Sequence, residues 1–311
     1  MRQIAPFVNI KSNYQLHAVK SGLVGIEKLN SFSTDEIGWA KAFSLYNGEK
    51  PLPLVWTDTP IPGNFGDWLS PYILTKISKR NVAHIDERDI RKNTHYVGLG
   101  SIIGSANNRS IVIGAGISKL QTEINPNARF WSVRGPYTNE IIKKNGGQVA
   151  NIMGDPGFLL PRIYKPKKLN NRGVVLVRHL NHLNMPLALP KHITEISIKG
   201  ANPKDIELFI DQINSASLVV TSAMHCFIVC VAYRIPTILF KPKSERIPVP
   251  GDGIKYRDAT SGVGLPEAIP VEIDLASNIE QQITSITPYA GILNTSNLNE
   301  LYQLYQRLSN A

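Results

Sequence analysis

The chain has 311 residues, of which 42% are hydrophobic and 19% charged, and this length suffices for one large or two medium-sized domains with substantial cores. No apolar run approaches the roughly 18 residues that span a bilayer, and the N-terminal segment lacks the hydrophobic stretch of a secretory signal. We therefore expect a cytoplasmic protein. The formal net charge of +10 predicts anionic partners.

The densest basic run, at residues 162–178, contains no acidic residue. It lacks the interleaved aromatic residues of single-strand binders and any helix-turn-helix pattern, so we expect no nucleic acid as a partner. The run fits either a solvated linker or a surface that contacts anionic lipid at the inner face of the cell membrane.

Residues 1–50 contain no motif, although residues 34–46 have the pattern of a capped helix. From Leu52 onward, short apolar runs alternate with helical patterns, and between the first strand and helix we expect Gly66 to permit a tight turn and Asp67 to cap the helix. The predicted strands are residues 54–56, 96–97, 111–113 and 130–133, and the predicted helices are 67–78 and 137–144.

Two of these strands run into glycine-rich turns. Gly98 and Gly100 are followed by Gly104, one residue away from the dinucleotide fingerprint, and no acidic residue follows at the expected distance, so we exclude a nicotinamide site. The glycines at neighbouring strand ends still predict that a ligand approaches the backbone closely.

Arg134 follows the strand at 130–133, where its forked guanidinium suits a carboxylate or phosphate. The alternative is that Arg134 only stabilises the turn.

A second strand series begins at residues 174–177 and continues with a strand at 218–220, a helix at 224–233 and a strand at 237–240. His225 lies at the carboxyl end of a strand and the start of a helix, where open α/β sheets bind anions. The alternative is that this histidine caps the helix or bonds a backbone carbonyl. His179 also follows a strand, and we expect both histidines to face the same cleft.

Histidine and cysteine spacing argues against a metal site. His179 and His182 are spaced as metal ligands can be, but no third ligand follows at a matching distance. Cys226 and Cys230 are four residues apart on one predicted helix, which favours core packing over a disulfide or a zinc site.

The two series predict an α/β protein with two Rossmann-like domains facing a cleft, similar to the arrangement of glycosyltransferases of the B type. We expect an N-terminal segment of unclear role at 1–50, a first domain at 51–165 and a second at 166–311. The helical spacing of apolar residues at 298–308 predicts a last helix that crosses back to the first domain.

Five short motifs occur in the order found in one known family. They lie at residues 64–67, 132–138, 153–161, 223–226 and 254–258. Together they resemble the polysaccharide pyruvyl transferases, especially the succinoglycan-type bacterial branch. This chain has Ala223 where many members have arginine, and Cys226 where they have glycine.

The resemblance implies transfer of a pyruvyl group from phosphoenolpyruvate to two hydroxyl groups of a hexose, giving a cyclic ketal in a surface polysaccharide or its lipid-linked precursor, with no metal or organic cofactor. His225 would be the acid or base, and His179 its partner or a phosphate ligand. With no arginine at position 223, His225 is also expected to bind part of the anion and to titrate above its ordinary pKa of about 6.5. The other substrate-binding residues that the resemblance implies are Arg134, Arg178, Lys255 and Arg257 for the charges of the donor, and Asn64, Asp67 and Asp155 for sugar hydroxyl groups.

Two other classes of function stay open. A glycosyltransferase that uses a nucleotide sugar would have the same fold, because fold does not determine chemistry. A non-catalytic carbohydrate- or anion-binding protein would account for the residues at positions 223 and 226. Phosphate release from phosphoenolpyruvate separates the pyruvyl transferase from both.

Overall fold

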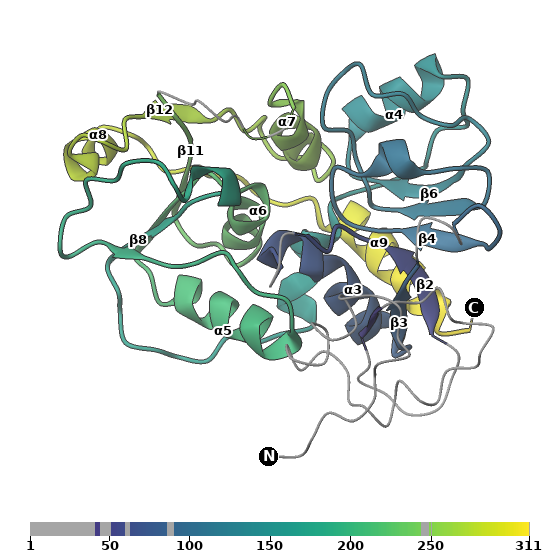
Figure 1. Cartoon of the computed structure of the whole chain (residues 1–311), viewed down its shortest axis with the longest axis horizontal. Coiled ribbons are helices and arrows are strands. Elements are labelled where there is room, and N and C mark those ends of the chain that lie inside the picture. The colour runs from purple at the N-terminus through teal and green to yellow at the C-terminus, as the bar shows by residue number, and fades with distance from the viewer. Residues whose placement is uncertain are drawn as a thin grey trace.

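The computed structural model describes residues 41–43, 51–59, 63–85, 90–243, 249 and 251–310. Two sheets with helices around them form the two halves of the molecule (Figure 1). The predicted α/β fold with two Rossmann-like halves is confirmed by these sheets, in which every pairing between described strands is parallel except that of one edge strand.

The first sheet has seven strands in the order β1-β3-β2-β4-β5-β6-β7, and its edge strand β1 is antiparallel to β3. The strands are β1 (Lys41–Phe43), β2 (Leu52–Val55), β3 (Val82–His84), β4 (His95–Val97), β5 (Ser110–Ile113), β6 (Arg129–Val133) and β7 (Ile152–Met153). The helix predicted at 34–46 is therefore wrong at Lys41–Phe43, where pairing with β3 overrides the local helical pattern. The rest of that predicted helix lies outside the described residues.

The second sheet has five parallel strands in the order β12-β11-β10-β8-β9. They are β8 (Val174–Val177), β9 (Thr194–Glu195), β10 (Leu218–Thr221), β11 (Thr237–Pro242) and β12 (Val271–Ile273). The central strands β8 and β10 are almost entirely buried, as their apolar, β-branched runs predict for a sheet covered on both faces.

The helices lie between and around the sheets (Figure 1). They are α3 (Phe65–Ser78), α4 (Pro136–Lys144), α5 (Pro203–Asn214), α6 (Met224–Ala232), α7 (Ile254–Ser261), α8 (Ile279–Thr284) and α9 (Thr295–Arg307), with a 3₁₀ helix η4 at Pro156–Arg162. Asparagine side chains cap the first turns of α3, α5, α8 and α9. None of the helices in the described part of the chain has the length and apolar character needed to cross a bilayer.

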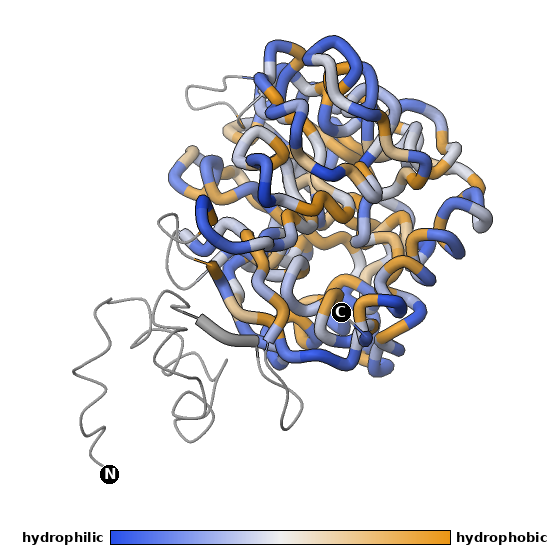
Figure 2. The backbone as a smooth tube through the Cα atoms, turned by 90° about the vertical axis from the view of Figure 1, so that its right-hand side faces the viewer, coloured by the Kyte–Doolittle hydropathy of each residue, from blue (hydrophilic) through white to orange (hydrophobic). Residues whose placement is uncertain are grey.

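The two halves share one hydrophobic core. A continuous cluster includes Leu54 and Ile113 of the first sheet, Val175 and Val219 of the second, and most of α6. Figure 2 shows hydrophobic segments concentrated in the interior of the fold. The last helix, α9, packs on the first half of the chain, where the Tyr305 hydroxyl donates a hydrogen bond to the carbonyl of Ile113 at 2.7 Å. Burial across this shared core fixes the two sheets against each other.

Candidate active site between the two sheets

Each sheet changes its direction of winding at one point, and the two points meet. In the first sheet β3 and β4 lie on opposite sides of β2, and in the second β9 and β10 lie on opposite sides of β8. Such switch points leave a crevice at the carboxyl ends of the strands, where open α/β sheets bind ligands. A cavity of about 500 Å³ at this place is lined by residues from both halves.

Three of the described helices begin at this cavity. Gly66 and Asp67 are in the first turn of α3, Met224 and His225 start α6, and Lys255 is in the first turn of α7. The positive ends of three helix dipoles therefore point at one space, and they favour an anion there. The side chains of Asn64 and His179 also line it; other lining residues, which sequence analysis did not predict, are Thr57, Thr59, Ser101, Ile102, Ser118, Leu180, Asn181 and Ile198.

His225 is 9% exposed and packs against the start of α3. A side-chain carbon on Gly66 would collide with Nδ1, Cβ and Cγ of His225. Gly66 is helical and does not have a positive φ, so the expected tight turn is wrong: glycine is needed here because the imidazole occupies the space of a side chain. The motif at 64–67 and the histidine 159 positions later are thus parts of one contact.

Asp155 lies behind His225, and its carboxyl group is fully buried. Its Oδ1 accepts a hydrogen bond from the backbone N–H of Gly157 at 2.8 Å, which caps η4. Its Oδ2 lies 3.9 Å from Nε2 of His225, too long for a hydrogen bond, and neither atom has another partner among the described residues. Asp155 therefore faces the histidine from inside the core, and its predicted contact with a sugar hydroxyl stays untested.

Burial determines the protonation of this pair. It raises the pKa of Asp155 to about 6, against the opposing charge of Arg134. Burial, with Arg134 and Lys255 nearby, lowers the pKa of His225 to about 3. At neutral pH the imidazole of His225 is therefore uncharged, whereas a carboxyl group with a pKa of about 6 has mostly lost its proton, so the contact is not an ion pair. The expectation that His225 titrates above 6.5 is wrong, since desolvation and the two cations both disfavour imidazolium.

His179 also lines the cavity. Its Nδ1 accepts a hydrogen bond from the backbone N–H of Asn181 at 3.2 Å, and the backbone N–H of His179 donates to Oγ of Ser222 at 2.9 Å. Burial, and then the charge of Lys255, lowers its pKa to about 3. His182, in contrast, is fully buried behind Ser222 and lies outside the cavity lining. The structure thus brings His179 and His225 to one cavity, as expected.

Asn64 and Asp67 begin α3 and form a small polar unit. Asn64 caps the helix by accepting from the N–H of Gly66 at 3.2 Å, and its amide donates to Oδ2 of Asp67 at 2.9 Å. Helix capping therefore falls to Asn64 and not, as predicted, to Asp67. Burial raises the pKa of Asp67 to about 7, although Asn64 and Lys255 oppose the shift. This carboxyl group consequently carries a proton in a large fraction of molecules at neutral pH.

Arg134 does not line the cavity. Its guanidinium is fully buried and donates from Nε to Oδ2 of Asp258 at 3.0 Å, from Nη1 to Oγ of Ser101 at 2.9 Å, and to the carbonyl of Ile117. A ligand would have to displace one of these partners to bind it. The geometry therefore favours the alternative to anion binding: Arg134 is a structural residue that connects the end of β6 to α7.

Two other predicted anion binders also have protein partners elsewhere. Arg178 is buried and donates from Nε to Oε1 of Glu195 at 2.7 Å and from Nη2 to Oε2 at 3.2 Å. Arg257 is partly exposed, pairs with Glu267 and stacks on Tyr137. Neither lines the cavity. Arg178 follows the end of a strand and Arg257 is two residues after Lys255, as the sequence indicates. The direction of each side chain, however, depends on the packing of the whole chain.

The strand-end glycines make room for the protein itself. A side-chain carbon on Gly98 would collide with Oγ of Ser70, one on Gly114 with the ring of Pro156, and one on Gly116 with the guanidinium of Arg134. The space at these three glycines is filled, but Ser101, Ile102 and Ser118, in or next to the same turns, line the cavity, so the approach of a ligand to the turns stays a prediction. Cys226 and Cys230 are free and buried, as predicted. In the described ranges, no group of three histidine, cysteine or carboxylate side chains is arranged to hold a metal.

Comparisons with known proteins assign the chain to a family. An uncharacterised protein of Acanthamoeba polyphaga mimivirus is 23% identical over 207 residues, which are 65% of this chain and 71% of that protein. The crystal structure of a functionally uncharacterised protein from Klebsiella pneumoniae aligns with 63% of this chain and 85% of its own, at a TM-score of 0.39 and 13% identity. The polysaccharide pyruvyl transferase model matches residues 72–244, more than half of the chain, including β10 and His225. The chain therefore belongs to the polysaccharide pyruvyl transferase family.

Proposed function

We propose that this protein transfers the pyruvyl group of phosphoenolpyruvate to two hydroxyl groups of a hexose in a surface polysaccharide or its lipid-linked precursor. Family membership supports a transferase of this kind. The observation that carries the proposal is the convergence of three helix N-termini and Lys255 on one cavity that also holds two neutral histidines. Such a site suits a donor with a carboxylate and a phosphate.

The reaction needs one proton delivered and two removed. A proton is added to the methylene carbon of the donor, and one hydroxyl oxygen bonds to the adjacent carbon and loses its proton. The second hydroxyl oxygen then bonds to the same carbon as the carbon–oxygen bond to phosphate breaks, and its proton leaves with the phosphate. The net products are the ketal, with its carboxylate and new methyl group, and inorganic phosphate.

The protonation states suggest which group does which step. His225 is neutral at physiological pH because its pKa is lowered to about 3, so it can accept the proton of the attacking hydroxyl. Asp67, with a pKa raised to about 7, is a proton source for the methylene carbon. We thus assign His225 as the base and Asp67 as the acid, which divides between two residues the role first given to His225.

The remaining residues hold the reactants. Lys255 lies at the cavity with the start of α7 and is assigned to the carboxylate or phosphate of the donor. His179 has Nδ1 occupied as an acceptor, which leaves Nε2 to donate a hydrogen bond to phosphate or a sugar oxygen. Asn64 is assigned to a sugar hydroxyl at the rim. Arg134 and Asp155 lie behind the cavity. Arg134 holds α7 in place through Asp258, and Asp155 faces His225.

The proposal is tested by mixing the protein with phosphoenolpyruvate and measuring thermal stability, then phosphate release with a hexose-containing acceptor. We expect stabilisation of about 2.7 kcal/mol when the donor is at 100 times its dissociation constant, with affinity that falls as salt rises. Lys255→Gln should weaken donor binding by about tenfold or more, whereas Lys241→Gln, at an exposed lysine paired with Glu272, should leave it unchanged.

The outcome that overturns the proposal is equally direct. If a nucleotide sugar stabilises the protein while phosphoenolpyruvate neither binds nor releases phosphate, the chain is a glycosyltransferase. If neither donor reacts but neutral oligosaccharides bind, it is a carbohydrate-binding protein.

A further inference from the structure

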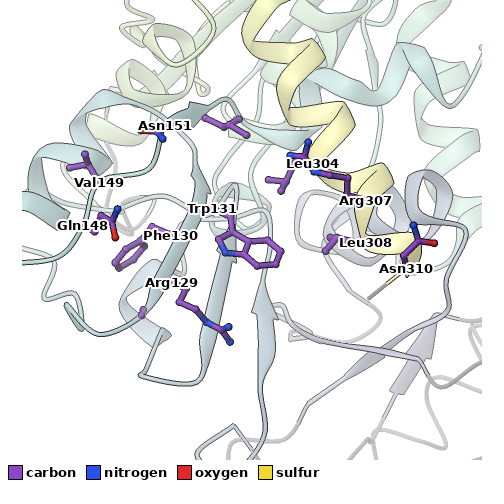
Figure 3. A pocket seen from close by; sticks show the side chains of 12 residues that line it. Arg129, Phe130, Trp131, Gln148, Val149, Asn151, Leu304, Arg307, Leu308 and Asn310 are labelled. Carbon is purple, nitrogen blue, oxygen red and sulfur yellow. The ribbon is translucent and has the colours of Figure 1, made fainter.

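A second cavity, of about 640 Å³, lies between β6 and the end of α9. Its lining includes Arg129, Trp131, Gln148, Asn151, Arg307 and Asn310, and we call it the arginine–tryptophan pocket (Figure 3). Arg129 begins β6, whereas Arg134 directly follows its other end at the back of the candidate active site. The two cavities share no lining residue and are thus separate sites.

Trp131 gives this pocket an aromatic surface. Along β6, Phe130 and Val133 point into a core cluster, while Trp131 faces the other way and is 39% exposed. Figure 3 shows its ring directed into the space between β6 and the end of α9. Tyr96 packs against it in a T-shaped contact at 6.4 Å between ring centroids and holds it in place. The indole is therefore a fixed, solvent-accessible platform.

The pocket is positively charged. Arg129 and Arg307 approach it from β6 and from the last residue of α9, and no aspartate or glutamate is among its lining residues. Within the described part of the chain, neither guanidinium makes an ion pair or a side-chain hydrogen bond. Both forks are available to an anion, and arginine binds carboxylates through two parallel hydrogen bonds.

Three amide side chains complete the pocket, from Gln148, Asn151 and Asn310. Each amide both donates and accepts hydrogen bonds, as a hydroxyl group does. An aromatic platform with amides suits a sugar ring, which has an apolar face and a rim of hydroxyl groups, while two arginines add a requirement for negative charge. A neutral sugar would leave both guanidinium groups without a partner.

We propose that the arginine–tryptophan pocket is a second binding site for a carboxylate-bearing saccharide. The identity of that saccharide rests on the proposed function, because each ketal that the proposed reaction forms at the candidate active site adds one carboxylate to the polymer. A hexose that has already been modified fits this pocket, while an unmodified one fits the candidate active site. The pocket would then retain the acidic part of a growing chain on the enzyme between transfers.

The test measures binding without turnover. An oligogalacturonide, a neutral maltooligosaccharide of the same length and adenosine monophosphate are titrated into the full chain, and the indole N–H signal of Trp131 is followed by NMR after assignment with Trp131→Phe. We expect the acidic oligosaccharide to shift this signal and to bind at least about tenfold more tightly than the neutral one. Arg129→Gln and Arg307→Gln should each weaken its binding by about tenfold.

The controls separate this pocket from the candidate active site. Arg109→Gln removes the same charge from an exposed position outside the pocket and should leave binding unchanged. His225→Gln should also leave oligogalacturonide binding unchanged, so the result does not depend on whether phosphoenolpyruvate is the donor. Equal affinity for the neutral oligosaccharide, tighter binding of the nucleotide, or unaltered binding by both pocket variants would overturn the proposal.

Discussion

At the residue scale, the site depends on two buried groups, His225 and Asp155, that face each other without forming an ion pair. His225 and Asp155 approach to 3.9 Å, and burial shifts the pKa of each toward its uncharged form. A neutral imidazole is the form that accepts a proton from a hydroxyl group. Burial and the charges of Arg134 and Lys255 thus keep His225 as a neutral imidazole, although Asp155 lies close to it.

Replacing His225 tests this role. We expect His225→Gln to lower the turnover of phosphoenolpyruvate by about 100-fold or more, because the proton acceptor is lost. Donor-induced thermal stabilisation should persist, since Lys255 and the helix N-termini remain. His192→Gln, at an exposed histidine paired with Glu280, is the matched control and should retain full turnover. Turnover within about threefold of wild type, together with a clear loss of stability, would show that His225 is structural.

The pH dependence of stability tests Asp155. Its folded-state pKa is raised from 3.8 to about 6, so its contribution to stability is fully present below pH 3.8 and is lost as the pH rises through 6. The amide that Asp155→Asn introduces does not titrate, and its oxygen can still accept from the N–H of Gly157. We therefore expect the stability of Asp155→Asn, relative to wild type, to rise by roughly 2–3 kcal/mol between about pH 4 and pH 7.

Denaturant unfolding at several pH values measures this change. Any constant penalty from the new amide cancels, because only the trend with pH is compared. Asp274→Asn provides a contrast: hydrogen bonds from Ser277 and Ala276 lower the pKa of Asp274, so its stabilising effect is present above the unfolded pKa and disappears in acid. A difference between Asp155→Asn and wild type that does not vary with pH would show that folding does not raise the pKa of Asp155.

At the element scale, the start of α3 is shaped by a neighbour from the other half of the chain. Asn64 caps the helix, and residues 64 and 65 also pair with the segment around Ile198, whose carbonyl accepts from the N–H of Phe65 at 2.9 Å. Gly66 then lies directly under the ring of His225. The first turn of α3 therefore positions the histidine as well as beginning a helix.

Gly66→Ala tests that contact. In an ordinary helix this change stabilises by up to about 1 kcal/mol, but here the new methyl group collides with His225, so we expect a loss of about 1–3 kcal/mol and reduced turnover. Gly104→Ala, whose new carbon would have its nearest neighbour at 3.4 Å, should fold normally. The double variant Gly66→Ala/His225→Ala should recover stability relative to the sum of its parts; strict additivity would exclude the contact as the cause.

At the scale of the whole molecule, the cavity is held open by contacts that join the two halves. Asp258 on α7 binds Arg134 and also accepts from the N–H of Thr138 at 3.0 Å and its hydroxyl at 2.6 Å. Farther away, Tyr72 and Lys76 of α3 both donate to Glu207 of α5. With the shared core, these contacts place Lys255 and the starts of α3 and α6 around a preformed site.

Breaking the buried pair should therefore unfold the protein more easily. We expect Asp258→Asn to cost about 3–5 kcal/mol, because it leaves the guanidinium of Arg134 buried without a compensating charge. Glu272→Gln, which removes an exposed carboxylate paired with Lys241, should change stability by no more than about 0.5 kcal/mol. If Asp258→Asn is as stable as wild type and loses only donor affinity, Arg134 contacts the donor after all.

The sequence by itself determined the alternation of strands and helices, the parallel sheets and the position of His225 at the end of a strand and the start of a helix. These follow from apolar periodicity and capping within a few residues, which are local properties. Only the tertiary structure decided that Arg134 binds Asp258, 124 positions away, and that Gly66 makes room for His225. Burial, side-chain direction and pKa depend on neighbours brought together from distant parts of the chain, and no local pattern encodes them.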